Sequence, residues 1–578
     1  MADFLLSQLD FIYFFYGLAF FSVGTACFAI SRGHGEAAAW LTLGAFALLH
    51  GACEWLDLAA LVAGDQLAFA FVRVALNTAS FMLLAEFGRL ESERLGRRPP
   101  GRWIYGLLGL VVLLGAAFGG PSAGGAISRY LICFPAALLA SWVFFMQADG
   151  FFGRMRRLAL VTSLTLLVYA AAAGLVPPQA PFWPASIIND HWFVRTTGVP
   201  IQLVRGALAL VLGYVGWVTW SRLVMSELRS DLYTMHAHRQ YLRASIALAA
   251  TLVCGWVLTD YLGDVYRRHA ENEARGGVEL LASRLNSDTS AVDALAKALA
   301  GSPSVSALLT GGREAKNAAS ILDMDVRVSG AEGGAIYNRA GVVIALSRRP
   351  TACLDAMVKD FPVLPAGGRI FALSPDNRSP YYCTGAPIVS RGVVVGAAVL
   401  ELSLAPFAAA LTQVAQPSFM IDGDGVVMAS NRPQMLLQAL WPLASDKGAT
   451  LAARYGRLNT SPLAARKIDD GAWVDTVWRR AYMRRRLIAN GPWSLVIMTP
   501  PTGVVISRML GIGVTFMVIV LGALSLLWRE HMMRGRLHMS RRLKAQKLAH
   551  DRATLATLAL SQSDPSGRMQ DVRSVLSS

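Results

Sequence analysis

The chain has 578 residues, of which 54% are hydrophobic and 16% are charged, and its mean hydropathy is positive. This composition excludes an ordinary soluble domain and indicates a polytopic membrane protein. The formal net charge of +16 does not indicate nucleic-acid binding, because the basic residues lie in short clusters beside apolar segments. The six cysteines are too few for a disulfide framework.

Nine apolar segments are long enough, at about twenty residues, to cross the hydrocarbon core of a bilayer. They cover residues 11–31, 37–62, 67–87, 103–118, 126–147, 158–176, 199–223, 244–262 and 504–528. The predicted domains are a seven-span membrane unit (1–224), a cytoplasmic connector (225–243), an eighth transmembrane helix (244–264), a polar block (265–500), a ninth transmembrane helix (503–528) and a basic cytoplasmic tail (529–578).

The distribution of arginine and lysine predicts the orientation of the chain. Basic clusters lie at 89–102, 154–157, 229–243 and 529–547, and all four fall on one side when the nine spans alternate. Because loops rich in arginine and lysine stay in the cytoplasm, we expect the N-terminus and residues 265–500 to be extracytoplasmic and the C-terminus to be cytoplasmic. The predicted location is a bacterial inner membrane.

The polar block begins as a helix over 265–300 and continues as short strands separated by glycine-containing turns. One strand–turn–strand pattern runs from Gly334 to Ala345, and a second runs from Ser418 to Ala429. Strand, glycine turn and strand, repeated behind a long helix, predict two stacked α+β modules. The expected fold class is therefore a polytopic α-helical membrane protein with an α+β extracytoplasmic domain.

Several motifs of this block, taken in order, resemble a known family. They are Ile336-Tyr337-Asn338-Arg339-Ala340-Gly341, Tyr381-Tyr382 with Pro387-Ile388, the run from Gly392 to Leu402, Asp422-Gly423-Asp424-Gly425-Val426-Val427, Ser430-Asn431-Arg432-Pro433 and Pro492-Trp493-Ser494-Leu495. With these motifs, residues 265–528 resemble the periplasmic double-Cache sensor, a PAS-like fold, of C4-dicarboxylate sensor histidine kinases. The resemblance implies a helical stalk, a membrane-distal pocket for a small ligand and a membrane-proximal module that passes on the signal.

The resemblance also implies where the distal pocket lies, namely after the first strand pair and around the paired tyrosines. Those stretches offer Ser347, Arg348, Arg349, Lys359, Arg369, Tyr381, Tyr382 and Thr384. An arginine suits a carboxylate because its planar fork donates two parallel hydrogen bonds. Where the family has an Arg-x-Tyr-Phe element, this chain has Val358-Lys359-Asp360-Phe361. We therefore expect a small anionic ligand that need not be a dicarboxylate.

Two cysteines of the polar block, Cys353 and Cys383, are a possible disulfide if the block is extracytoplasmic. Their separation in sequence does not decide whether they pair.

Ionisable residues inside apolar spans form a second candidate site, because such residues are costly in a membrane and usually face a bundle interior. His50, Glu54 and Asp57 share one helical face, and other spans add Arg73, Asn77, Arg129 and Arg205. Structural charge pairing is the favoured interpretation. The alternatives are a ligand, proton or metal sensing site and a transport site. The segment from His50 to Asp57 resembles an amino-terminal membrane region of some bacterial sensor kinases and cyclases, which implies no ligand.

The C-terminal tail lacks recognisable catalytic signatures. His550 superficially resembles a kinase phosphoacceptor, but no sequence typical of an ATP-binding domain or a cyclase follows it. We expect a non-enzymatic sensory receptor, without metal or cofactor, that signals to a separate cytoplasmic protein. We also expect a homodimer. The seven-span unit is expected to provide a second input or to couple through 223–243. The alternatives are a truncated sensor histidine kinase and a transporter or enzyme centred on His50, Glu54 and Asp57.

Overall fold

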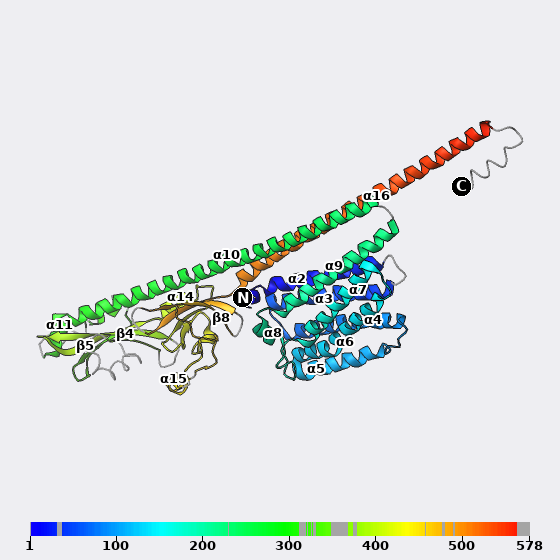
Figure 1. Cartoon of the computed structure of the whole chain (residues 1–578). Coiled ribbons are helices and arrows are strands. Elements are labelled where there is room, and N and C mark those ends of the chain that lie inside the picture. Colours follow the sequence, from blue (N-terminus) through cyan, green and yellow to red (C-terminus); the bar gives the residue numbers. More distant parts are fainter. Residues whose placement is uncertain are drawn as a thin grey trace. The chain divides into compact units, whose positions relative to one another are not determined.

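The computed structural model divides the chain into two compact units (Figure 1). The first comprises Met1–Asp260 and Arg508–Ser578 and is called the helical unit here, whereas Tyr261–Ser507 is called the sheet domain. The structure describes residues 2–31, 37–228, 231–310, 320, 322–324, 326–327, 331–347, 368–373, 379–444, 446–456, 458–476, 480–488 and 492–562.

The helical unit is built from long apolar helices. They are α1 (Ala2–Ser7), α2 (Leu9–Ser31), α3 (Ala37–Ala63), α4 (Leu67–Arg94), α5 (Trp103–Ser128), η1 (Arg129–Cys133), α6 (Phe134–Ala148), α7 (Gly153–Tyr169), η2 (Ala170–Leu175), α8 (Asp190–Thr197) and α9 (Ile201–Leu228), with parts of α10 (Asp231–Ala300) and α16 (Thr502–Gln562). Within the described ranges, eight helical segments are long and apolar enough to cross a membrane. Helices suit this setting because they satisfy their backbone polar groups internally.

The difference between these eight segments and the nine predicted spans arises at α5. The segment Trp103–Ala148 counts once, although Gly120 has φ 79° and Pro121 follows it. A β-carbon added to Gly124 would lie 3.1 Å from the Cα atom of Ala116. Residues eight apart in a straight helix would be separated by about 12 Å, so the chain reverses here. The predicted spans 103–118 and 126–147 lie on opposite sides of this reversal, and the number of membrane crossings stays a prediction.

The sheet domain contains two five-stranded antiparallel sheets with the same topology. Their orders are β2-β1-β5-β4-β3 and β7-β6-β10-β9-β8. The first sheet consists of β1 (Gly333–Asn338), β2 (Val343–Ser347), β3 (Arg369–Leu373), β4 (Pro380–Ser390) and β5 (Val393–Ser403). The second consists of β6 (Ser418–Ile421), β7 (Val427–Ser430), β8 (Gly471–Asp475), β9 (Arg480–Leu487) and β10 (Ser494–Thr499). Shorter helices are α11 (Pro303–Leu309), α14 (Ala405–Leu411), η4 (Pro433–Met435) and α15 (Lys447–Tyr455).

The first hairpin of each sheet is closed by the same device. Gly341 and Gly425 have φ of 79° and 96°, a conformation that glycine adopts without steric cost. The side chain of Asn338 accepts hydrogen bonds from two backbone N–H groups of its turn, and that of Asp422 accepts three. These equivalent turns explain why the sequence pattern identified the repeat.

Helix α10 forms a common support for both sheets. Val278, Leu281 and Leu285 lie on one face and are buried in a core that includes Phe371 of the first sheet and Leu495 of the second. The rings of Phe371 and Trp493 stack at 4.9 Å, which joins the modules directly. Helix α10 has 70 residues without a break, so it contains both the helix predicted over 265–300 and the predicted eighth span.

Within the helical unit, α10 and α16 lie along each other with their backbones in close approach (Figure 1). A β-carbon on Gly255 of α10 would lie 2.2 Å from Oγ1 of Thr515 on α16, and one on Gly511 would lie 2.6 Å from Oγ1 of Thr259. Each helix thus contributes a Gly-x-x-x-Thr pair to one antiparallel contact. Small residues at this spacing allow membrane helices to pack closely. We call this contact the Gly/Thr seam.

The Gly/Thr seam predicts that Gly511→Ala destabilises the helical unit by about 1–3 kcal/mol, the usual cost of overpacking. The added methyl group would meet the backbone of Thr259 at 2.8 Å, so the helices must move apart. Thermal unfolding of the purified full chain in lipid nanodiscs measures the effect. Gly513→Ala is the matched control, because a β-carbon there meets nothing within 4 Å. Equal midpoints for the two variants would contradict the prediction.

Candidate functional site

Of the sequence-predicted ligand residues of the sheet domain, those that the structure describes fall on β2, β3 and β4. Arg369 pairs in register with Thr384, and Phe371 pairs with Tyr382, so these side chains share one face of the sheet. Tyr381 lies on the opposite face because side chains alternate along a strand. Arg348, Arg349 and Lys359 lie outside the described residues.

A carboxylate on α10 connects two of the predicted residues. Asp293 is buried and accepts a hydrogen bond from the Tyr382 hydroxyl at 2.7 Å. Its carboxylate also forms an ion pair with the Arg369 guanidinium at 2.8 Å. The Arg369 side chain is 38% exposed, so its guanidinium keeps donors that a ligand can reach. Asp293 was missed by the sequence analysis, because an acidic residue on an amphipathic helix normally indicates only a solvated face.

Ser347 lies apart from this group. It hydrogen-bonds the Asp323 carboxylate and ends β2, at the opposite edge of the five-stranded sheet from Arg369 on β3. Four strand spacings of about 4.8 Å separate the two edges. Cys383 is disulfide-bonded, and Cys353, the partner considered from the sequence, lies outside the described residues. Of the predicted ligand residues, Arg369 and Tyr382 are thus brought together by Asp293, and we call these three residues the triad.

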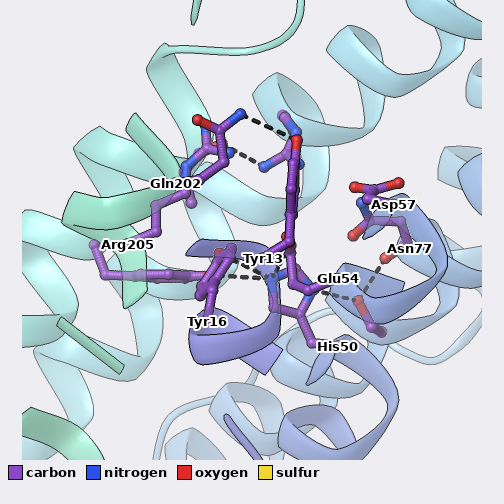
Figure 2. Close-up of polar contacts among 12 residues, drawn as sticks. Tyr13, Tyr16, His50, Glu54, Asp57, Asn77, Gln202 and Arg205 are labelled. Atoms are coloured by element: carbon purple, nitrogen blue, oxygen red, sulfur yellow. Dashed lines mark hydrogen bonds and ion pairs between the residues drawn. The ribbon is translucent and has the colours of Figure 1, made fainter. Parts of the chain in front are cut away.

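A second group of polar side chains is buried in the helical unit around His50 of α3 (Figure 2). The Nε2 atom of His50 lies 3.0 Å from the Tyr169 hydroxyl, 3.4 Å from the Tyr16 hydroxyl and 3.5 Å from Oε1 of Glu54. Its Nδ1 atom lies 3.2 Å from Oγ of Ser80. We call these five residues the His50 centre.

The other predicted intramembrane residues have separate partners. Asp57 pairs with Arg73, which also pairs with Asp65. Asn77 is next to the His50 centre through its backbone carbonyl, which accepts a hydrogen bond from Ser80 at 2.6 Å. The structure thus separates an Asp57–Arg73 ion pair, as expected for charge pairing, from the His50 centre.

Arg129 and Arg205 donate hydrogen bonds to backbone carbonyls where the helical backbone is irregular. Arg129 donates to the carbonyl of Ala173 at 3.2 Å, and Arg205 donates to the carbonyl of Ala172 at 3.0 Å and to that of Val176. These carbonyls belong to or directly follow the π-helix η2, and Arg129 itself begins the π-helix η1. Wide turns weaken the helical hydrogen-bond pattern, and the guanidinium groups supply donors that lipid cannot provide.

Metal binding at the His50 centre is not supported by its ligand set. Within the part of the chain that the structure describes, no group of three or more histidine, cysteine, aspartate or glutamate side chains could hold a metal ion.

Tyr16, Tyr169 and Ser80 of the His50 centre were missed by the sequence analysis, because tyrosine and serine are unremarkable in an apolar helix. Their relation to His50 depends on contacts between helices far apart in sequence.

A third polar group ties the N-terminus to both long helices. Arg508 of α16 donates to Asp10 at 2.7 Å and to Gln8 at 2.9 Å, and it lies 3.6 Å from Asp260 of α10. Gln8 also donates to Asp260 at 2.7 Å. We call these four residues the Arg508 clasp. The sequence suggested residues 223–243 as the segment that couples the seven-span unit to the sheet domain, and some of these residues lie outside the described ranges. The Arg508 clasp involves other residues.

No family model matches the sequence, and no curated protein sequence matches it. Solved structures similar to part of the chain are sensory ligand-binding domains. One is the sensor domain of the V. cholerae histidine kinase DctB, with a TM-score of 0.35 and 13% identity, covering 41% of this chain and 98% of that chain. Another is the ligand-binding domain of the Pseudomonas aeruginosa PAO1 amino acid chemoreceptor PctC in complex with GABA, with a TM-score of 0.30 and 14% identity, covering 39% and 99%.

A third is the sensory domain of the Campylobacter jejuni chemoreceptor Tlp3 with isoleucine bound. It has a TM-score of 0.31 and 13% identity, and the match covers 43% of this chain and 98% of that chain. At these TM-scores, the likeness identifies neither the family nor the ligand of this chain.

The triad predicts an alkaline loss of stability that depends on Tyr382. Burial and the hydrogen bond to Asp293 raise the pKa of Tyr382 above its usual value, so the folded state favours the neutral hydroxyl. This contribution is complete below the unfolded pKa of about 10 and is lost as pH rises through the raised folded value. Tyr382→Phe should cost about 1 kcal/mol at neutral pH and reduce the alkaline loss, as measured by calorimetry of the full chain.

Tyr381→Phe is the control for this measurement, because that ring lies on the other face of β4. A wild-type alkaline profile in Tyr382→Phe, or equal losses in the two variants, would contradict the assignment.

Proposed function

We propose that the chain is a membrane-bound sensory receptor whose sheet domain binds a small, anionic molecule. The ligand contacts Arg369 from the side that the ion pair with Asp293 leaves exposed. Binding biases the packing of α10 against α16, and a separate cytoplasmic protein reads the change. In this proposal the protein is a homodimer in a bacterial inner membrane, and it detects the ligand without catalysing a reaction.

The observation that carries this proposal is the continuity of α10. Asp293, which holds Arg369 and Tyr382, and Thr259, which contacts α16, belong to the same unbroken helix. They are 34 positions apart, or about 50 Å along a helix with a rise of 1.5 Å per residue. A rigid helix transmits a shift at one end to the other, as an irregular linker would not.

The second long helix completes the connection. Strand β10 ends at Thr499, and α16 begins at Thr502 and includes the seam residues Gly511 and Thr515. The sheet domain is therefore attached to the seam through α10 and through α16. A ligand shifts this equilibrium only by the difference between its affinities for the two arrangements of the helices.

The ligand proposal predicts that some small organic acids or amino acids stabilise the full chain in a saturable manner. At a ligand concentration of 100 times Kd, the expected stabilisation is about 2.7 kcal/mol. Arg369→Gln should weaken binding by about tenfold or more, because a charge-assisted hydrogen bond contributes about 1.5–3 kcal/mol. Thermal shifts in nanodiscs, followed by calorimetric titration of the compounds that respond, measure both effects.

Arg432→Ala, which removes an exposed arginine after the second sheet's first hairpin, is the matched control and should leave Kd unchanged. Failure of every compound to give a saturable shift, or an unchanged Kd in Arg369→Gln, would remove the ligand proposal.

The proposed orientation predicts which side of the membrane each domain occupies. In a Cys254→Ser background, which removes the exposed free cysteine of the described residues, Val389→Cys on β4 should react with a membrane-impermeant maleimide in intact spheroplasts. Leu555→Cys on α16 should react only after permeabilisation. Both positions are exposed, at 51% and 63%, so accessibility of the side chain itself does not differ greatly. Protection of Val389→Cys until permeabilisation would reverse the proposed sidedness.

A further inference from the structure

The hydrogen bonds around His50 determine which of its ring nitrogens carries a proton. Ser80 has one hydroxyl proton, and it donates this proton to the Asn77 carbonyl at 2.6 Å. Towards His50 Nδ1, at 3.2 Å, the Ser80 oxygen can therefore only accept. We infer that neutral His50 has its proton on Nδ1 and an unprotonated Nε2.

This tautomer creates a conflict at the other ring nitrogen. Nε2 can accept from the Tyr169 hydroxyl at 3.0 Å, but it also faces Oε1 of Glu54 at 3.5 Å. The Glu54 oxygen is buried and has no hydrogen-bond partner among the described residues. Two acceptors thus face each other in an apolar interior, where an unpaired polar group is costly. One additional proton, on either atom, converts this contact into a hydrogen bond, and the Tyr169 hydroxyl, which then gives up the single lone pair of Nε2, can turn to the Tyr16 hydroxyl at 3.5 Å.

We propose that Glu54 and His50 form a buried proton-binding site that acts as a second input to the proposed receptor. A proton from the aqueous phase binds between Oε1 and Nε2 and forms one hydrogen bond, and its release leaves the Glu54 carboxylate and neutral His50. A proton needs no cavity, and it matches Oε1 of Glu54, a buried acceptor that has no hydrogen-bond partner among the described residues. This inference rests on the proposed function for its output but not for the site itself.

Groups from every neighbouring helix surround this pair. The titratable or charged ones are Tyr13 and Tyr16 of α2, Cys53 and Asp57 of α3, Arg73 of α4, Arg129 and Cys133 of η1, Tyr169 of α7 and Arg205 of α9. Arg129 and Arg205 provide positive charge for the deprotonated state, in which Glu54 is an anion. The surroundings therefore accommodate both states of the pair.

The residue after Glu54 connects the site to α16. Trp55 contacts Phe516 of α16 edge-on at 5.4 Å and stacks on Phe14 of α2 at 6.2 Å. Leu58 of α3 and Ile512 of α16 belong to the same buried cluster. Because a close-packed interior transmits small displacements, a change at Glu54 that turns α3 also moves its contacts with α16.

The Arg508 clasp adds a second connection through α2. Helix α2 carries Tyr16 of the His50 centre and, two turns earlier, Asp10 of the clasp. A β-carbon on Gly17 would lie 2.4 Å from the Trp55 side chain, so α2 and α3 are in close contact beside the site. Protonation of Glu54 and His50 can thus reach α16 through α3 and through α2.

Infrared difference spectroscopy between acidic and neutral pH, on the full chain in nanodiscs without added ligand, tests the proton site. Wild type should show a titrating band of a protonated carboxyl group or of the His50 imidazole. Glu54→Gln, which mimics the protonated carboxyl group, should lose that band. Asp65→Asn, which neutralises a half-exposed carboxylate of the neighbouring ion pair, should keep it. An unchanged difference spectrum in Glu54→Gln would overturn the proposal.

Distance measurements test the role as an input. Nitroxide labels at Leu61→Cys on α3 and Leu521→Cys on α16, both exposed positions, are introduced in the Cys254→Ser background. The distance between labels should change over the pH range in which the infrared band titrates, and it should be independent of pH with Glu54→Gln. A constant distance in wild type, or the same pH dependence in Glu54→Gln, would overturn the input role. Because no ligand is present, neither result depends on whether the sheet domain binds one.

Discussion

The Gly/Thr seam between α10 and α16 is the contact on which the proposed signalling depends. Gly255 and Gly511 bring the two backbones together, and each lies against a threonine of the other helix. The hydroxyl of Thr259 is buried there without a hydrogen-bond partner among the described residues, which costs about 1–3 kcal/mol. A shift of one helix along the other that gave this hydroxyl an acceptor would recover part of that cost. The Gly/Thr seam is therefore tightly packed, and its Thr259 hydroxyl, unpaired among the described residues, would favour a second arrangement of α10 and α16 that supplied an acceptor.

The apolar surroundings explain why several buried polar residues of the helical unit have definite partners. Arg129 and Arg205 supply donors to the carbonyls of η2, which no water replaces in a bilayer. Asp57 neutralises Arg73. The pair of Glu54 and His50 differs from these groups, because its hydrogen bond is incomplete without a further proton. Structural contacts thus account for Asp57, Arg73, Arg129 and Arg205. They leave the pair of Glu54 and His50 unexplained, as well as the side chain of Asn77, whose Oδ1 also lacks a partner among the described residues.

The sequence predicted those features that depend on local pattern. The apolar spans, the helix over 265–300 and the two glycine-turn hairpins follow from periodicity and turn residues. The sequence did not predict Asp293 or Tyr169, because a carboxylate on an amphipathic helix and a tyrosine in an apolar one become notable only through distant contacts. Tyr169 is 119 positions from His50, and Asp293 is 89 positions from Tyr382. Ser347 was grouped with Arg369 by motif order, whereas strand order places them at opposite sheet edges.

Two inputs on one pair of helices have a thermodynamic consequence. If ligand binding at Arg369 and proton binding at Glu54 and His50 both bias the same equilibrium of α10 and α16, each changes the affinity for the other by the same factor. The two sites need no contact for this coupling, because both act on helices that share the Gly/Thr seam. The proton would then set how readily the ligand moves the helices, and the ligand would set how tightly the buried pair holds its proton. A receptor built in this way reports the ligand relative to the local proton concentration and not the ligand alone.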